Sequence, residues 1–149
     1  MRFALPHGVA GYELRGSGSN NYTKYLARSL ARAGNEVHII CRDSQPSDYR
    51  PWLGECYRYS ADGSRVSLWE ADPDLGDASA MASGGSATMH VLPLGRLAPV
   101  YQTDMKHPGI VKPFRDISDS ELEEYTALAS SVVAKILAST GLDLLHCNH

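Results

Sequence analysis

The first 41 residues change their hydrophobic spacing twice, and this limits the folds open to the chain. Arg2–Leu5 is a short apolar run that predicts a strand, ended at once by Pro6. Val37–Cys41 is almost continuously apolar and mostly β-branched, which is typical of a parallel strand covered on both faces. Between them, one stripe recurs at helical spacing and predicts a buried helix face: Tyr22, Tyr25, Leu26, Ser29, Leu30 and Ala33. Strand, helix and strand in this order predict a right-handed βαβ unit.

A long loop, Pro6–Ser19, connects the first strand to this helix and ends in the turn Gly16-Ser17-Gly18-Ser19. A glycine-containing turn before a helix gathers unpaired backbone N–H groups at the positive end of the helix dipole, which suits a phosphate or another electron-rich group. Alternatively, the glycines only satisfy turn geometry, and Ser19 or Asn20 caps the helix. A dinucleotide fingerprint is excluded, because Asn21 stands where G-x-G-x-x-G requires its third glycine. The absence of a following G-K-[ST] excludes a P-loop.

The last third of the chain repeats the alternation. Ser118-Asp-Ser-Glu121 is a capping box, and Gly141 is a natural helix stop. The strand that we expect next is Leu142–Cys147, buried in the sheet. The apolar face of the intervening helix is predicted to comprise Leu122, Tyr125, Ala129, Val132, Val133, Ile136 and Leu137.

The middle of the chain is less regular. We expect short strands at Tyr57–Tyr59 and Val66–Trp69 around a turn, and another strand at Met89–Pro93. Asp72–Ser86 is rich in Asp, Ser, Ala and Gly, which predicts a mobile surface loop. The segment Arg96–Arg115 mixes aromatic, charged and turn residues without a period and is either a connection or a binding loop.

Composition excludes several classes of function. With 149 residues, a net charge of −3 and a pI near 6, the chain is expected to be one domain without the basic surface of a nucleic-acid-binding protein. It contains neither a run long enough for a membrane span nor a signal-peptide core, so we expect a cytoplasmic protein. The cysteines show no metal spacing, and Cys41 and Cys147 follow apolar runs, which suits buried reduced thiols. We expect no metal and no cofactor.

Together these elements predict an α/β fold with a doubly wound, mostly parallel sheet. Ligands bind such sheets beyond the carboxyl ends of the strands. This rule brings His7 and the Gly16–Ser19 turn together with Arg42-Asp43 and with Asn148-His149. The histidines inside strands, His38 and His146, are expected to be packed residues.

The two ends of the chain resemble the N-terminal lobe of glycosyltransferase family 4. The residues concerned are Arg2–Leu5, the Gly/Ser loop and Asn21–Ile40 at one end, and Asp143-Leu-Leu-His-Cys-Asn-His149 at the other, which is similar to the family's Asp-x-x-His-x-His stretch. The resemblance implies a retaining enzyme with two Rossmann-like lobes, the GT-B architecture. Residues 1–149 would be the acceptor-side lobe and a fragment, without the second lobe that binds the nucleotide.

The resemblance also implies roles for individual residues. Gly16, Ser17, Gly18 and Ser19 occupy the place of the loop that approaches the donor's diphosphate and sugar. The family's second histidine faces the transferred sugar; here Asn148 takes that position and His149 follows, so either or both contact the sugar. On the acceptor side we place His7, Arg42, Tyr101 and Lys106.

The expected substrates are a nucleotide sugar and a sugar or lipid-linked acceptor, the latter compatible with peripheral membrane contact by the complete enzyme. Without a clamp of cationic residues for the leaving diphosphate, we expect no turnover by these residues alone. Two alternatives remain open at this point. One is a non-catalytic module that binds a phosphate or sugar phosphate at Gly16–Ser19. The other is a small α/β enzyme with His7 or His149 as general base.

Overall fold

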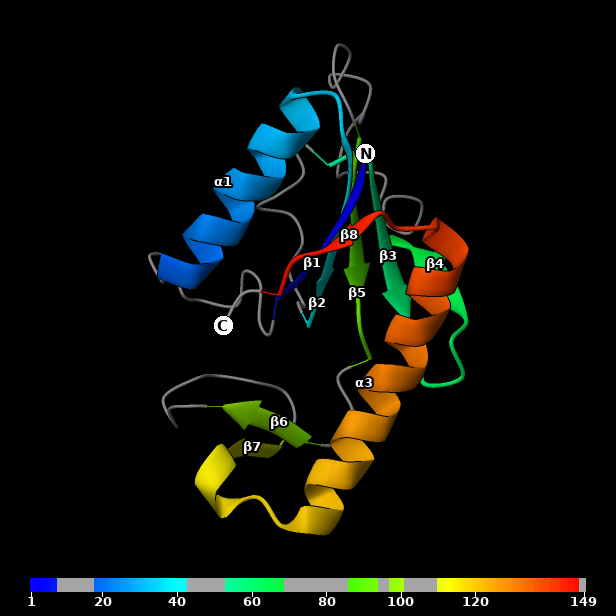
Figure 1. The fold of residues 1–149 in the computed structure, drawn as a ribbon. Coiled ribbons are helices and arrows are strands. Elements are labelled where there is room, and N and C mark those ends of the chain that lie inside the picture. The colour runs from blue at the N-terminus through cyan, green and yellow to red at the C-terminus, as the bar shows by residue number, and fades with distance from the viewer. Residues whose placement is uncertain (8–17, 43–52, 69–85, 94–96, 101–109, 148–149) are drawn as a thin grey trace.

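The computed structural model describes residues 1–7, 18–42, 53–68, 86–93, 97–100 and 110–147 as an α/β protein (Figure 1). Its main sheet has six strands in the order β4-β3-β5-β2-β1-β8, and all neighbours are parallel except the antiparallel pair β3 and β4. The strands are β1 (Arg2–His7), β2 (Glu36–Cys41), β3 (Glu55–Tyr59), β4 (Arg65–Ser67), β5 (Ala87–Val91) and β8 (Leu144–Leu145). The predicted α/β class and mostly parallel sheet are confirmed.

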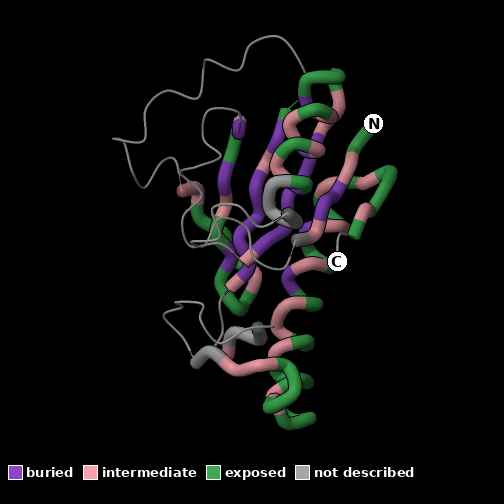
Figure 2. Tube along the Cα trace, turned by 90° about the vertical axis from the view of Figure 1, so that its left-hand side faces the viewer, coloured by how far each residue is buried: buried purple, intermediate pink, exposed green. Residues whose placement is uncertain are grey.

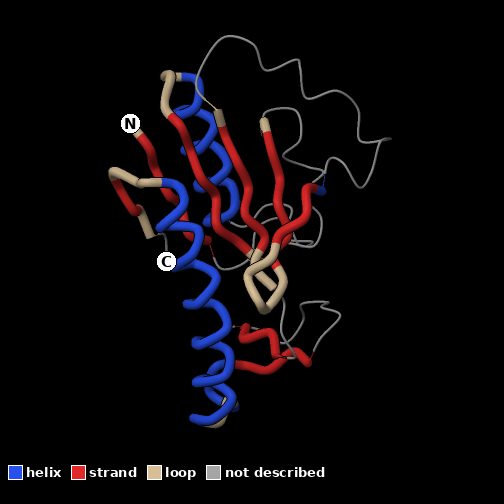
Figure 3. The backbone as a smooth tube through the Cα atoms, turned by 90° about the vertical axis from the view of Figure 1, so that its right-hand side faces the viewer, coloured by secondary structure: helices blue, strands red, loops and turns tan. Residues whose placement is uncertain are grey.

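One helix covers each face of this sheet, as Figures 1 and 3 show. The first, α1 (Gly18–Arg32), packs Ala27 and Ala31 on Leu5, Val37 and Ile39, among other residues. The other, α3 (Asp119–Thr140), packs Val132 and Ile136 on the opposite face. Because successive strand residues point to opposite faces, β2 contributes buried side chains to the core on both faces of the sheet. Figure 2 shows the buried residues concentrated along the central strands.

The buried stripe of α1 agrees with the predicted one only in part, since Leu26 and Leu30 pack, partly buried, against the core. Thr23, Ala27 and Ala31 are buried, whereas Tyr22 and Tyr25 are 48% and 61% exposed. Small side chains face the sheet, so the helix lies close to it and the tyrosines flank the contact. The register of the stripe could not be chosen from hydrophobicity alone, because alanine and tyrosine are both compatible with either position.

The first strand also extends past Pro6 to His7, contrary to the predicted break. The carbonyls of Arg2 and Ala4 accept hydrogen bonds from Asp143 and His146, on the β8 side of β1. Pro6 shares their orientation, so its missing N–H faces the two-residue edge strand and not β2. The strand therefore loses no hydrogen bond to its central neighbour.

Three further elements are present as predicted, two of them with other bounds. Tyr57–Tyr59 lies in β3, and the strand predicted at Val66–Trp69 is β4, which ends at Ser67. The strand predicted at Met89–Pro93 is β5, which begins at Ala87 and ends at Val91. At α3 the capping box is complete, with the Ser118 amide donating to Glu121 Oε2 at 2.9 Å.

Residues 96–115 were expected to be irregular, and this is wrong in part. They contain the parallel strands β6 (Leu97–Val100) and β7 (Ile110–Pro113), followed by a 3-10 helix, Phe114–Asp116. Figure 1 places this pair beside the first half of α3, below the main sheet. Only the second half of α3 packs in the core, which is why Leu122 of the predicted apolar face is 43% exposed. Of the predicted mobile loop Asp72–Ser86, all but Ser86 lies outside the described residues.

Gly34 closes the end of α1. Gly34 has φ 82°, its N–H donates to Ala31, and the N–H of Asn35 donates to Leu30, as in a Schellman motif. An added Cβ would meet nothing within 4 Å, so Gly34→Ala should cost only the left-handed backbone penalty, about 1 kcal/mol. Urea unfolding would measure it. Gly54→Ala is the matched control: its φ is not positive and its nearest contact would be an ordinary 3.7 Å, so a comparable loss there would contradict this explanation.

Candidate functional site

The start of α1 and the end of β8 meet at the carboxyl edge of the sheet. The Tyr22 hydroxyl lies 3.5 Å from His146 Nε2, and the two ring centroids are 6.1 Å apart. Tyr22 is in the first turns of α1, and His146 follows β8 directly, held by its N–H, which donates to the Ala4 carbonyl at 2.8 Å. Two segments at opposite ends of the sequence are therefore adjacent at the edge where parallel sheets bind ligands.

The sequence predicted that His146 and Cys147 lie in a buried strand, and this is wrong. β8 contains only Leu144 and Leu145, which are 43% and 49% exposed, because it is the last strand of the described sheet and pairs with β1 alone. His146 lies beyond its end, half-buried beside Tyr22, and Cys147 is exposed. An apolar run of this length cannot reveal whether the strand is central or at an edge.

Arg42 brings a cation to the same edge of the sheet. It follows β2 directly, and its guanidinium carbon lies 5.0 Å from the centre of the Tyr125 ring of α3. Burial lowers the pKa of Arg42, and the nearby Tyr125 hydroxyl opposes this shift. A guanidinium stays charged even when its pKa is lowered, so the edge carries a fixed positive charge stacked on an aromatic ring.

The structure places the other predicted site residues as follows. His7 is the last residue of β1, at the carboxyl edge. Gly18 and Ser19 belong to the first turn of α1 and not to the preceding loop, so Ser19 and Asn20 do not cap the helix. Outside the described residues lie Gly16, Ser17, Tyr101, Lys106, Asn148 and His149.

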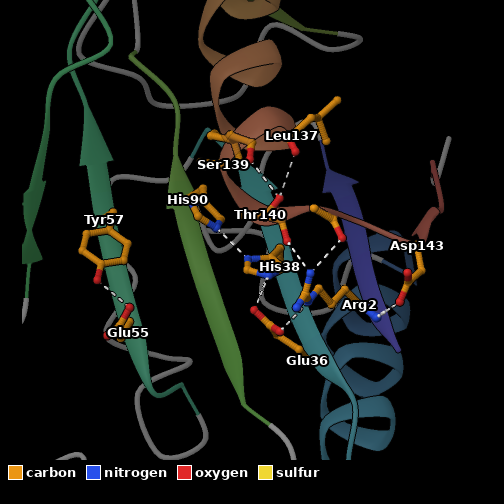
Figure 4. Close-up of polar contacts among 12 residues, drawn as sticks. Arg2, Glu36, His38, Glu55, Tyr57, His90, Leu137, Ser139, Thr140 and Asp143 are labelled. Carbon is orange, nitrogen blue, oxygen red and sulfur yellow. Dashed lines mark hydrogen bonds and ion pairs between the residues drawn. The ribbon is translucent and has the colours of Figure 1, made fainter.

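The sequence did not indicate a second polar cluster, buried beneath α3 (Figure 4). His38 of β2 and His90 of β5 are 5% and 2% exposed, and His38 Nδ1 lies 3.0 Å from His90 Nε2. His90 Nδ1 is 3.0 Å from the Tyr59 hydroxyl, and His38 Nε2 is 3.1 Å from Glu36 Oε1. His38 is thus a packed strand residue, as expected. The sequence shows one histidine in each of two apolar strands, but it does not show that these strands are neighbours or in which register they pair.

Burial is the largest of the causes that lower the pKa of His90. Together with the neighbouring His38 and Arg65, it lowers the pKa of His90 to about 3, so this imidazole is neutral in the folded protein at physiological pH. At the outer end of the cluster, Arg2 Nε donates to Glu36 Oε2 at 3.1 Å, and Arg2 also reaches the Gly141 carbonyl at 3.2 Å.

In the part of the chain that the structure describes, no group of three or more His, Cys, Asp or Glu side chains is arranged to hold a metal ion. Cys41 and Cys56 are buried and not in a disulfide, and Cys147 is exposed, so the prediction of a buried thiol is confirmed for Cys41 and wrong for Cys147. No helix in the described ranges combines the length and the apolar character that crossing a bilayer requires.

Comparisons with protein-family models, with curated proteins and with solved structures find no match for this chain.

Proposed function

We propose that residues 1–149 form the Rossmann-like, acceptor-side domain of a retaining glycosyltransferase, which transfers a sugar from a nucleotide sugar to an acceptor. The observation that carries the proposal is the 3.5 Å contact between Tyr22 and His146. It brings the start of α1, at Gly18 and Ser19, next to the segment that leads to Asn148 and His149. These are the two segments that the proposed reaction needs around one donor.

Each part of the edge has a role in this proposal. The N–H groups at the start of α1 face the donor's diphosphate, because the helix dipole favours negative charge there. Asn148 and His149 contact the transferred sugar through hydrogen bonds to its hydroxyls. On the acceptor side we place Arg42, which stacks on Tyr125, together with His7, Tyr101 and Lys106.

A titration of the isotopically labelled chain, followed by NMR, tests the proposal. Nucleotide sugars should shift the amide signals of Tyr22, Arg42 and His146, and no sugar should be transferred, because a leaving diphosphate needs a clamp of cationic residues that we expect in a second lobe. Sugar transfer by this chain alone, or shifts confined to the opposite edge near Arg2, would contradict the proposal. Tight binding of free sugar phosphates without a nucleotide preference would favour the non-catalytic module instead.

Tyr22 is the residue to substitute, since it makes the contact between the two segments. Tyr22→Ala should weaken nucleotide-sugar binding severalfold, because the end of β8 then loses its contact with α1. Tyr25→Ala is the matched control: Tyr25 lies in the same helix, is 61% exposed, and should bind like the wild type. Equal affinities of the two variants, measured in the same titration, would remove Tyr22 from the site.

A further inference from the structure

One hydrogen-bonded chain crosses the α3 face of the sheet. It runs from Arg65 of β4 to Tyr59 of β3, His90 of β5 and His38 of β2. It continues through Glu36 of β2 to Arg2 of β1, whose guanidinium reaches the carbonyls of Thr140 and Gly141 at the end of α3 (Figure 4). The chain therefore connects the interior of the sheet to the helix that covers it.

With both imidazoles neutral, the Glu36 carboxylate sets the direction of the hydrogen bonds from His38 to Tyr59. A carboxylate only accepts, so His38 Nε2 carries a proton, and in a neutral ring His38 Nδ1 is then an acceptor. His90 Nε2 must then donate to His38 Nδ1, which leaves His90 Nδ1 to accept from the Tyr59 hydroxyl. Both imidazoles are neutral in this arrangement, and each ring nitrogen has one partner of the correct kind.

Protonation of His90 would disrupt this arrangement of hydrogen bonds. A second ring N–H on His90 would point at the Tyr59 hydroxyl, which already donates in that direction and is also hydrogen-bonded to Arg65. The charge would also stand in a layer closed by Val132 and Ile136 of α3, both 0% exposed. A buried charge without an acceptor is costly, and water can reach it only if α3 moves away from the sheet.

We propose that this chain is a pH-sensitive latch, which fastens α3 to the sheet while His90 is neutral and releases α3 when His90 takes up a proton in acid. Arg2 and Glu36 form its outer end, at the amino edge of the strands, and Glu36 is the half-exposed group through which protons enter. The latch adds a response to acid that the proposed sugar transfer does not require.

Other charged groups around the pair do not supply an alternative acceptor. Arg65 repels a proton on His90 and stacks on Tyr57, whose hydroxyl is hydrogen-bonded to Glu55. From α3, Lys135 donates to the Asp62 carbonyl in the turn between β3 and β4, at 2.6 Å. Among the described carboxylates, Glu36 is hydrogen-bonded to the pair, and it contacts His38 and not His90.

Amide exchange at pH 7 and pH 5, corrected for the intrinsic effect of pH, tests the latch in the full 149-residue chain. At pH 5, residues 132–140 of α3 should be at least about tenfold less protected than residues 23–32 of α1, because α3 is then released without global unfolding and its opening, coupled to one proton, rises tenfold per pH unit. In His90→Gln this difference should disappear, since an amide keeps hydrogen bonds in both directions but takes up no proton.

Equal protection of the two helices at pH 5 would overturn the proposal, since it would show that α3 is released only in global unfolding. The six histidine ring signals of the wild type give a second readout, which does not depend on a variant that folds. The His90 signal should not titrate while α3 stays protected. If it titrates near pH 6.5 with α3 still fully protected, the latch does not exist.

Discussion

Replacing Ile136 by alanine is expected to lower the free energy of unfolding by about 3 kcal/mol, the largest effect of any single substitution that we consider. Ile136 is 0% exposed and packs with Val132, Ala4, Ile40 and Tyr59 between α3 and the sheet. The substitution removes buried methyl and methylene groups and leaves a cavity, which costs 2–5 kcal/mol in well-packed cores. Since domains of this size are stable by only about 5–15 kcal/mol, urea unfolding will show the change clearly.

Leu122→Ala in the same helix is the control for this prediction. Leu122 is 43% exposed in the first turn of α3, away from the sheet, so its truncation should change the free energy of unfolding by less than about 1 kcal/mol. A loss at Leu122 as large as that at Ile136 would mean that α3 is held by its first half, contrary to the packing described above.

Acidification is expected to destabilise the protein by about 2 kcal/mol between pH 6.5 and pH 5 through His90 alone. In the unfolded chain a histidine has a pKa near 6.5, whereas burial, His38 and Arg65 lower the pKa of His90 to about 3 in the fold. Over this interval the unfolded state binds one proton more than the folded state. Stability is therefore complete above pH 6.5 and falls with pH, by about 1.4 kcal/mol per unit, until the folded pKa is reached.

Urea titrations at several pH values would measure this slope. In His90→Gln, the dependence of the free energy of unfolding on pH should be smaller by the contribution of one histidine, because glutamine cannot take up the proton. His146→Gln should keep the wild-type slope, since His146 is half-buried beside Tyr22 and lies outside the buried pair. If both variants flatten the slope equally, or neither does, the acid sensitivity comes from groups other than His90.

The local signals in the sequence determined most of the secondary structure. Val37–Cys41 is buried on both faces, Ser118 caps α3 through Glu121, and Gly34 and Gly141 end their helices in left-handed conformations. Each of these depends on the residue and its near neighbours: β-branched side chains, a hydroxyl three residues before a carboxylate, or the absence of a Cβ. Such features can be predicted from the sequence without knowledge of the tertiary structure.

Tertiary structure alone decided which segments meet. The contact between Tyr22 and His146 and the pairing of His38 with His90 depend on the order and register of the strands, which no local pattern encodes. The same holds for β8: an apolar pair of leucines forms a central strand when neighbours lie on both sides, and here an exposed edge because one side of the described strand has none. Burial is a property of the assembled sheet, so the sequence could supply the histidines but not the chain of hydrogen bonds that joins them.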